Sequence, residues 1–87
     1  MDYDIIILSK ADSFLKKISK KDKKSLEIIF VGLDKISKNP KNSEIMKSYF
    51  KGARKIRTGD YRIIFEIQKQ THSVAILEIM PRKKDYK

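Results

Sequence analysis

The second half of the sequence places a small set of cations and one tyrosine where they could bind an anion together. The set consists of Lys55, Arg57, Arg62, Arg82 and Tyr86. The chain otherwise prefers lysine, and its four arginines all lie between positions 54 and 82. Arginine differs from lysine in its planar guanidinium, which binds carboxylate or phosphate oxygens in a bidentate manner. This choice of residues indicates a site for a phosphate-like anion.

Such side chains suit one reaction class. RNA is cut when its own 2′-hydroxyl attacks the adjacent phosphate, and a catalyst must orient that attack, stabilise the extra negative charge and move two protons. Arginines can hold the non-bridging phosphate oxygens. A lysine or a tyrosine can exchange protons where neighbouring cations lower its pKa, and a tyrosine can instead stack on a base. The residue types alone therefore predict an anion-binding face compatible with RNA, and do not by themselves indicate a nuclease.

Residues 52 to 68 position three of these side chains, because they read as two strands joined at Gly59-Asp60. Glycine at the first central position of a two-residue loop favours a type II′ turn. The resulting register sets Thr58 opposite Tyr61, Arg57 opposite Arg62, Ile56 opposite Ile63 and Lys55 opposite Ile64. Side chains alternate between the two faces of a strand. One face is then an apolar core face with Ile56, Tyr61, Ile63, Phe65 and Ile67, and the other carries Lys55, Arg57 and Arg62.

The two facing arginines are the unusual feature of this hairpin. Like charges directly opposite each other destabilise a sheet. Arg57 and Arg62, with Lys55 beside them, therefore favour a bound anion. The alternative is that all three are simply solvated, with Glu66 as a partial counter-charge.

The first half of the chain predicts a strand followed by two helices. Residues 3 to 8 are rich in β-branched side chains and read as a strand; the run from Ile5 to Leu8 is apolar on both faces, which predicts a central or well-covered position. Apolar residues at helical spacing predict a helix over residues 10 to 19, capped by Ser9. A second helix, capped by Ser19 or Asp22, is expected to run to Lys38, where Asn39-Pro40 ends it. Its predicted buried stripe is Leu26, Ile29, Phe30, Leu33 and Ile36.

Two apolar residues of the second helix, Ile28 and Val31, lie off that stripe. They either pack on the first helix, as buried apolar surface usually does, or form a docking surface for another chain.

The rest of the chain is a connection, the hairpin, a polar turn and one more strand. Residues 41 to 51 form the connection, and residues 68 to 72 the turn, in which we expect the single histidine, His72. Residues 73 to 80 read as the last strand, and Pro81 is expected to stop its ladder. The predicted fold is α+β with the order β-α-α-β-β-β: a four-stranded, largely antiparallel sheet with a two-helix hairpin packed on one face. The first strand is expected beside the last, and the basic face of the hairpin on the open side.

Composition restricts the function classes. The 87 residues make one domain, and 21 Lys and Arg against 11 Asp and Glu give a net charge of +10, which points to nucleic acid or a ribosome as partner. The alternative is that many of the lysines are ordinary surface residues of a lysine-rich protein and bind no partner. There is no cysteine, no apolar run of about 20 residues that could span a bilayer, and an acidic start unlike a signal peptide. We therefore expect a soluble, cytoplasmic protein with no membrane partner, and the single histidine and three glycines predict neither a metal site nor a cofactor.

The stretch Gly-Ala-Arg-Lys-Ile-Arg-Thr-Gly-Asp-Tyr-Arg-Ile-Ile-Phe-Glu-Ile resembles the RelE/ParE superfamily of toxin–antitoxin toxins. It is followed by a short turn, an apolar strand and the tail Met-Pro-Arg-Lys-Lys-Asp-Tyr-Lys. The resemblance extends over residues 1–87 as a single RelE-like toxin domain, and is greatest to the RelE branch. Members of that branch are metal-independent, ribosome-dependent mRNA endonucleases, which cut mRNA in the A site and are held inactive by an antitoxin.

The resemblance also implies roles for individual residues. Arg62 and Arg82 would stabilise the phosphate and its transition state, Lys55 would transfer protons or bind phosphate beside Arg57, and Tyr86 would stack on a base or transfer a proton. Arg54, Lys83 and Lys84 would contact RNA. Family members often carry a further basic residue where this chain has Ala53.

The resemblance implies partners as well: a cognate RelB-like antitoxin, the ribosome and mRNA, with no direct DNA binding outside the antitoxin complex. The ParE branch, which targets DNA gyrase, generally lacks the complete arginine and tyrosine set. Three hypotheses follow: an mRNA endonuclease, a ParE-like gyrase inhibitor or catalytically weak toxin-fold protein, and a generic basic RNA-binding protein. The set Arg62, Arg82 and Tyr86 favours the first.

Overall fold

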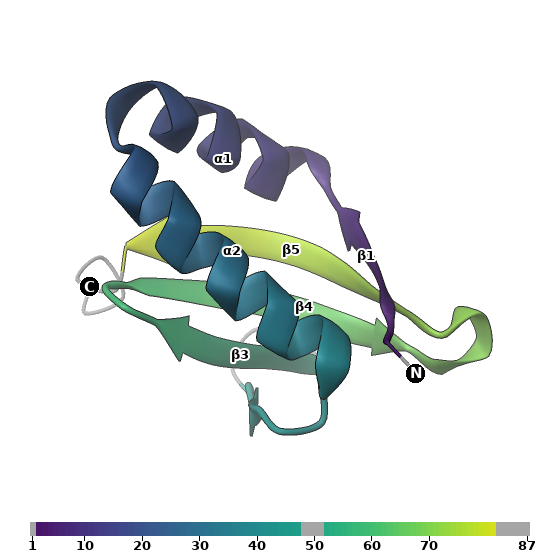
Figure 1. Ribbon diagram of the computed structural model, residues 1–87. Coiled ribbons are helices and arrows are strands. Elements are labelled where there is room, and N and C mark those ends of the chain that lie inside the picture. The colour runs from purple at the N-terminus through teal and green to yellow at the C-terminus, as the bar shows by residue number, and fades with distance from the viewer. Residues whose placement is uncertain (1, 48–51, 82–87) are drawn as a thin grey trace.

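The predicted order of elements is confirmed in the computed structural model, which describes residues 2–47 and 52–81 (Figure 1). A strand precedes two consecutive helices, and the remaining strands follow them. The elements are β1 (Asp4–Ile7), α1 (Ser9–Lys21), α2 (Lys23–Lys38), β2 (Glu44–Ile45), β3 (Ala53–Thr58), β4 (Tyr61–Gln68), the 3-10 turn η1 (Lys69–Thr71) and β5 (Ser73–Pro81). None of the helices in the described part of the chain is long and apolar enough to cross a membrane.

The sheet has the strand order β1-β5-β4-β3-β2. β1 lies beside β5, as predicted for the first and last strands, and the two strands are parallel. The other pairings in the sheet are antiparallel. The sequence predicted four strands, and the structure adds β2, a two-residue strand inside the expected connection. β5 also continues one residue further than predicted, because Pro81 pairs with Tyr61.

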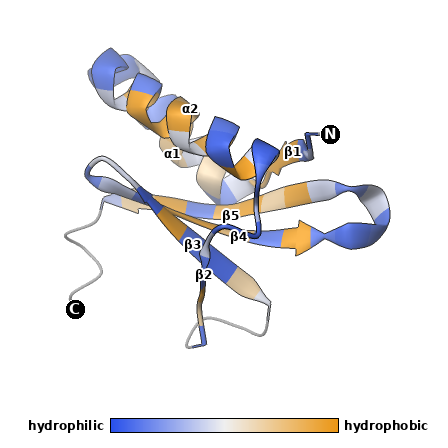
Figure 2. Ribbon diagram, turned by 60° about the horizontal axis from the view of Figure 1, so that its bottom comes forward, coloured by the Kyte–Doolittle hydropathy of each residue, from blue (hydrophilic) through white to orange (hydrophobic). Residues whose placement is uncertain are grey.

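Both helices cover the same face of this sheet (Figure 2), and their buried residues, Leu15 and Ile29 among them, pack in the core between the two layers. α1 contacts β5, and α2 contacts β3. The buried cluster between the layers takes side chains from both helices and from β4 and β5. Its members are Ala11, Leu15, Ile29, Leu33, Ile36, Ile63, Phe65, Val74, Ile76 and Ile79.

Three residues of the predicted stripe, Ile29, Leu33 and Ile36, are in this core, and Leu26 packs against it. Phe30 is 50% exposed, so its assignment to the buried face of α2 was wrong. Ser25 and Gly32 are buried on that helix instead. The helix approaches the sheet so closely that small residues are needed there, which an apolar pattern does not reveal.

The strand β1 was predicted correctly, but its predicted central or well-covered position was wrong. β1 is an edge strand with β5 as its only neighbour in the sheet, and Ile6 is 43% exposed. Polar contacts hold the start of the strand in place: the backbone N–H of Tyr3 donates to the carbonyl oxygen of Ser37 at 2.8 Å, and the Ser37 hydroxyl donates back to the Tyr3 carbonyl at 2.8 Å. The Tyr3 ring also stacks on His72, with ring centroids 3.9 Å apart.

Of the two predicted N-terminal helix caps, one is confirmed and one is wrong. The carboxylate of Asp22 accepts hydrogen bonds from the backbone N–H groups of Lys24 and Ser25, so Asp22 caps α2 as one of the two predicted alternatives. Ser9 does not cap α1. It is the first residue of that helix, and the cap position is Leu8, whose side chain has no oxygen to offer.

A candidate anion-binding face

The hairpin formed by β3 and β4 has the predicted register. Arg57 lies opposite Arg62, with Ile56 opposite Ile63 and Thr58 opposite Tyr61. Gly59 has a φ of 60°, and Asp60 does not share this left-handed conformation, as a type II′ turn requires. The two arginines therefore face each other across the strands, on the side away from the helices.

The same face has an apolar floor next to its cations. Ala53, Ile64 and Ala75 are 0%, 1% and 3% exposed, yet none belongs to the cluster beneath the helices. They alternate with Phe65 and the other core residues, so they lie on the opposite side of the sheet. The face therefore combines a buried apolar centre with Lys55 and the two arginines.

Lys55 has a partner that the sequence did not indicate. Its ammonium lies 3.9 Å from the carboxylate of Glu44, which belongs to β2 and is directly opposite Lys55 in the ladder. The Glu44 side chain is 72% exposed. Exposed pairs of this kind contribute only about 0–1 kcal/mol. A phosphate can therefore compete with Glu44 for Lys55, and finding this pair from sequence would have required finding β2.

Arg54 points to the other side of the hairpin, as alternation demands. Its guanidinium donates to the carbonyl oxygen of Ser43 at 3.3 Å and to the Ser43 hydroxyl at 3.2 Å, with a longer contact of 3.5 Å to the carbonyl of Lys41. It thereby ties the segment before β2 to β3. RNA binding by Arg54 stays a prediction, and so do the roles given to Arg82, Lys83, Lys84 and Tyr86, which lie outside the described residues.

Helix α2 fixes the turn that carries the two arginines. The hydroxyl of Thr58 donates to the carbonyl oxygen of Ile28 at 2.7 Å. A Cβ at Gly32 would lie 2.8 Å from the Cβ of Thr58, and a Cβ at Gly59 would lie 2.7 Å from the Cγ2 of Ile28. Ile28 therefore packs against the turn, whereas Val31 is 54% exposed.

A second contact joins the start of α2 to β4. The hydroxyl of Tyr61 donates to the Ser25 hydroxyl oxygen at 2.9 Å, and the Ser25 hydroxyl donates to the Asp22 carboxylate at 2.8 Å. This bond from Ser25 is the main reason that the pKa of Asp22 lies below its ordinary value. The three side chains link the cap of α2 to the residue that precedes Arg62.

The described residues do not include a group of three or more His, Cys, Asp or Glu side chains that could hold a metal ion. The open face combines the cations and the buried apolar residues with the carboxylate of Glu66, which lies opposite Ala53 and Ala75. The cations on this face suit a phosphate group.

Solved structures of other proteins share the fold of this chain. The toxin–antitoxin complex RelBE2 from Mycobacterium tuberculosis has a chain with a TM-score of 0.78 and 21% identity, over 94% of this chain and 93% of that one. For the YoeB dimer from Staphylococcus aureus the TM-score is 0.73 with 20% identity, over 90% and 94%. For the archaeal RelE–RelB complex from Pyrococcus horikoshii OT3 it is 0.70 with 22% identity, over 94% and 97%. The fold is thus that of the RelE-like toxins.

The sequence itself places the chain more closely. The profile of the ParE toxin family of type II toxin–antitoxin systems, parDE, matches residues 5–86. An uncharacterized protein of Methanosarcina mazei is 31% identical over 75 residues, which is 85% of this chain and 87% of that protein. The chain belongs to the ParE toxin family, within the RelE/ParE superfamily of type II toxins.

Proposed function

We propose that this toxin is a ribosome-dependent mRNA endonuclease, which inhibits translation by cutting mRNA in the A site. The observation that carries the proposal is the direct opposition of Arg57 and Arg62 on the open face of the sheet. Two guanidinium groups in this position are like charges directly opposite each other, which favours a bound anion beside them. A phosphate of the RNA backbone has the charge and the oxygen geometry that they need.

The reaction is an attack of the RNA 2′-hydroxyl on the adjacent phosphate. The oxygen–phosphorus bond forms as the bond to the 5′-oxygen of the next nucleotide breaks, so the 2′-hydroxyl loses a proton and the leaving oxygen gains one. Arg57 and Arg62 stabilise the charge that develops on the non-bridging oxygens. Lys55, once released from Glu44, is a third cation for the same phosphate. Arg82 and Tyr86 keep their predicted roles in charge stabilisation and in stacking or proton transfer.

The proposal includes a cognate RelB-like antitoxin as partner. Two of the similar structures are complexes of a toxin with its antitoxin. This chain also has apolar side chains that such a partner could cover: Phe30, Val31 and Ile45 are 50%, 54% and 60% exposed. Phe30 and Val31 lie on α2, and Ile45 lies on the edge strand β2.

Cleavage of an mRNA programmed on purified ribosomes tests the proposal, with the same mRNA free in solution alongside. Arg62→Ala and Arg82→Ala should abolish cutting in the A-site codon. Lys69→Ala is the control, because it removes one exposed positive charge from the turn η1, outside the candidate site, and it should leave cutting in place. No cut by the unaltered chain, on or off the ribosome, would refute the nuclease assignment.

A second candidate function is inhibition of DNA gyrase. The observation in its favour is the match to the ParE toxin family, because the ParE branch acts on gyrase. A supercoiling assay with purified gyrase separates the two: inhibition of supercoiling without mRNA cleavage would support the gyrase candidate and contradict the first proposal.

A further inference from the structure

A dense group of lysines surrounds the turn between α1 and α2, and the candidate site does not use it. Residues 16 to 24 contain six lysines, all exposed, and Asp22 is the only acidic residue among them. Figure 2 shows this end of the helical hairpin as hydrophilic. The five that concern us are named the tip lysines: Lys17, Lys20, Lys21, Lys23 and Lys24.

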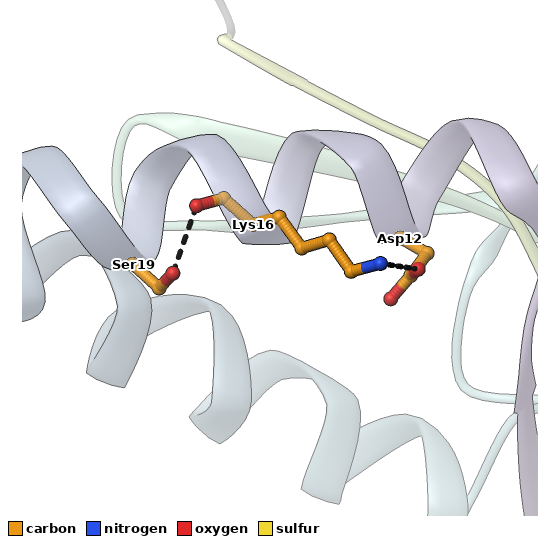
Figure 3. A network of polar contacts seen from close by, with 3 residues as sticks. All are labelled: Asp12, Lys16 and Ser19. Atoms are coloured by element: carbon orange, nitrogen blue, oxygen red, sulfur yellow. Dashed lines mark hydrogen bonds and ion pairs between the residues drawn. The ribbon is translucent and has the colours of Figure 1, made fainter.

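Lys16 is not included, because its charge has a partner. Its ammonium lies 3.2 Å from the carboxylate of Asp12, one helical turn earlier (Figure 3). Its carbonyl oxygen accepts a hydrogen bond from Ser19 at 2.8 Å. Within the described residues, no salt bridge involves any of the tip lysines. The Asp22 carboxylate is engaged with Lys24 N–H, Ser25 N–H and the Ser25 hydroxyl, and so lies in the cap of α2.

Helix stability does not account for these lysines. Cations are favourable in the last turn of a helix, which explains Lys20 and Lys21 at the end of α1. The positive N-terminal end of a helix disfavours them, yet Lys23 and Lys24 stand in the first turn of α2, which contains no acidic residue. Lys17 and Lys21 repel each other at a spacing of four residues. Residues that break local rules in this way are often there for function.

The tip lysines lie at the same end of the molecule as the two arginines. Figures 1 and 2 both place the α1–α2 turn and the β3–β4 turn at one end. The hydrogen bond from Tyr61 to Ser25, 2.9 Å long, joins β4 directly to the first turn of α2. The lysines are on the helix side of the sheet and the arginines on the other side, so an extended polyanion that passes around this end of the sheet can contact both surfaces.

We infer that the tip lysines bind the phosphate backbone of structured RNA beside the candidate site. This inference rests on the proposed function for its choice of RNA. The exposed large apolar side chains of the described chain are Ile6, Leu8, Phe30, Val31 and Ile45, none of which lies among residues 16 to 24. Binding in a membrane interface needs such side chains, and the centres of protein–protein interfaces are depleted in lysine. A surface of lysines alone reads phosphates without reading bases.

Salt titration of RNA binding tests this inference without any cleavage. The probe is an RNA duplex of about 16 base pairs, the length that a compact RNA-binding domain spans, followed by fluorescence anisotropy. In the test variant Lys20, Lys21, Lys23 and Lys24 are all changed to Gln. Each lost phosphate contact reduces the slope of log K against log salt by about 0.7 to 0.9, so four reduce it by about 3. Between 50 and 200 mM salt, the affinity of the unaltered chain should therefore fall about 100-fold more than that of the variant.

The matched control changes Lys35, Lys41, Lys47 and Lys69 to Gln. These four are also exposed, and their removal lowers the net charge by the same amount. The control should keep most of the original slope. Equal slopes for the two variants would mean that only the net charge matters, which would overturn the inference. An unchanged slope in the test variant would also overturn it. Tighter binding to vesicles containing anionic lipid than to the duplex would also overturn it.

Cleavage on the ribosome then separates the inference from the proposed function. The test variant should still cut at low salt and should lose cutting at lower salt concentrations than the unaltered chain. If the unaltered chain cuts no RNA at all, the endonuclease assignment fails while the duplex titration still decides whether the tip lysines bind RNA.

Discussion

Replacing Arg57 by Gln should stabilise the fold while it impairs the activity. Arg57 lies directly opposite Arg62, and a like-charge pair in this position costs about 0.2–1 kcal/mol. Removing one charge should therefore raise the free energy of unfolding by about 0.5 kcal/mol. In a domain of this size, that corresponds to about 2 to 4 °C in Tm, or about 0.5 M in the urea midpoint if m is about 1 kcal/mol/M.

Arg54→Gln is the control for this measurement, because it removes the same charge from the same strand. Arg54 donates hydrogen bonds to Ser43, and their loss should lower the urea midpoint. The effect of net charge alone is read from Lys69→Gln, which removes an exposed cation. A gain in Arg57→Gln that exceeds the gain in Lys69→Gln would be assigned to the facing arginines. A lower midpoint for Arg57→Gln at low salt would refute the reasoning, since the facing arginines would then not repel each other in the folded state.

Three further predictions concern the contacts between α2 and the hairpin. Gly32→Ala should lower the free energy of unfolding by about 1 kcal/mol, since overpacking against Thr58 costs about 1–3 kcal/mol and the gain in helix propensity is about 1 kcal/mol; an increase in Tm would contradict this. Tyr61→Phe should cost about 1 kcal/mol for its lost hydrogen bond, and a urea midpoint equal to that of the unaltered chain would show that the bond contributes nothing. Asp22 has a pKa below its ordinary value, so its contribution to stability is complete above about pH 4 and is lost as the pH falls further. The difference in unfolding free energy between the unaltered chain and Asp22→Asn should therefore shrink in acid, and a constant difference down to pH of about 2 would rule out this linkage.

The hairpin could be predicted from the sequence because its information is local. Gly59 selects the turn type, and the turn type sets the register that brings Arg57 opposite Arg62. Neither step depends on the rest of the chain. The same holds for the cap at Asp22, whose side chain bonds to residues two and three positions later.

The features that the sequence analysis missed depend on contacts distant in the chain. β2 has only two residues, and it exists because β3 offers a free edge to it. Phe30 has the spacing of a core residue, but α2 packs on Thr58 through Gly32 and not through Phe30. Periodicity of apolar residues does not reveal such a close contact at a glycine. The apolar run of β1 suggested a covered strand, but this strand lies at an edge, and its exposed Ile6 has no signature in the sequence.

The parallel pairing of β1 with β5 has a consequence for how the toxin is made. Asp4 pairs with Ser73 and Ile7 with Ile76, so the first strand cannot enter the sheet before the last strand has formed. Pairing across such a separation is slow, since the entropy of closing a long loop is lost before any contact forms. During synthesis the N-terminal strand remains unpaired until residues near 76 have left the ribosome. A toxin with this topology completes its sheet only after β5 has been translated and has left the ribosome, which delays the formation of the folded protein.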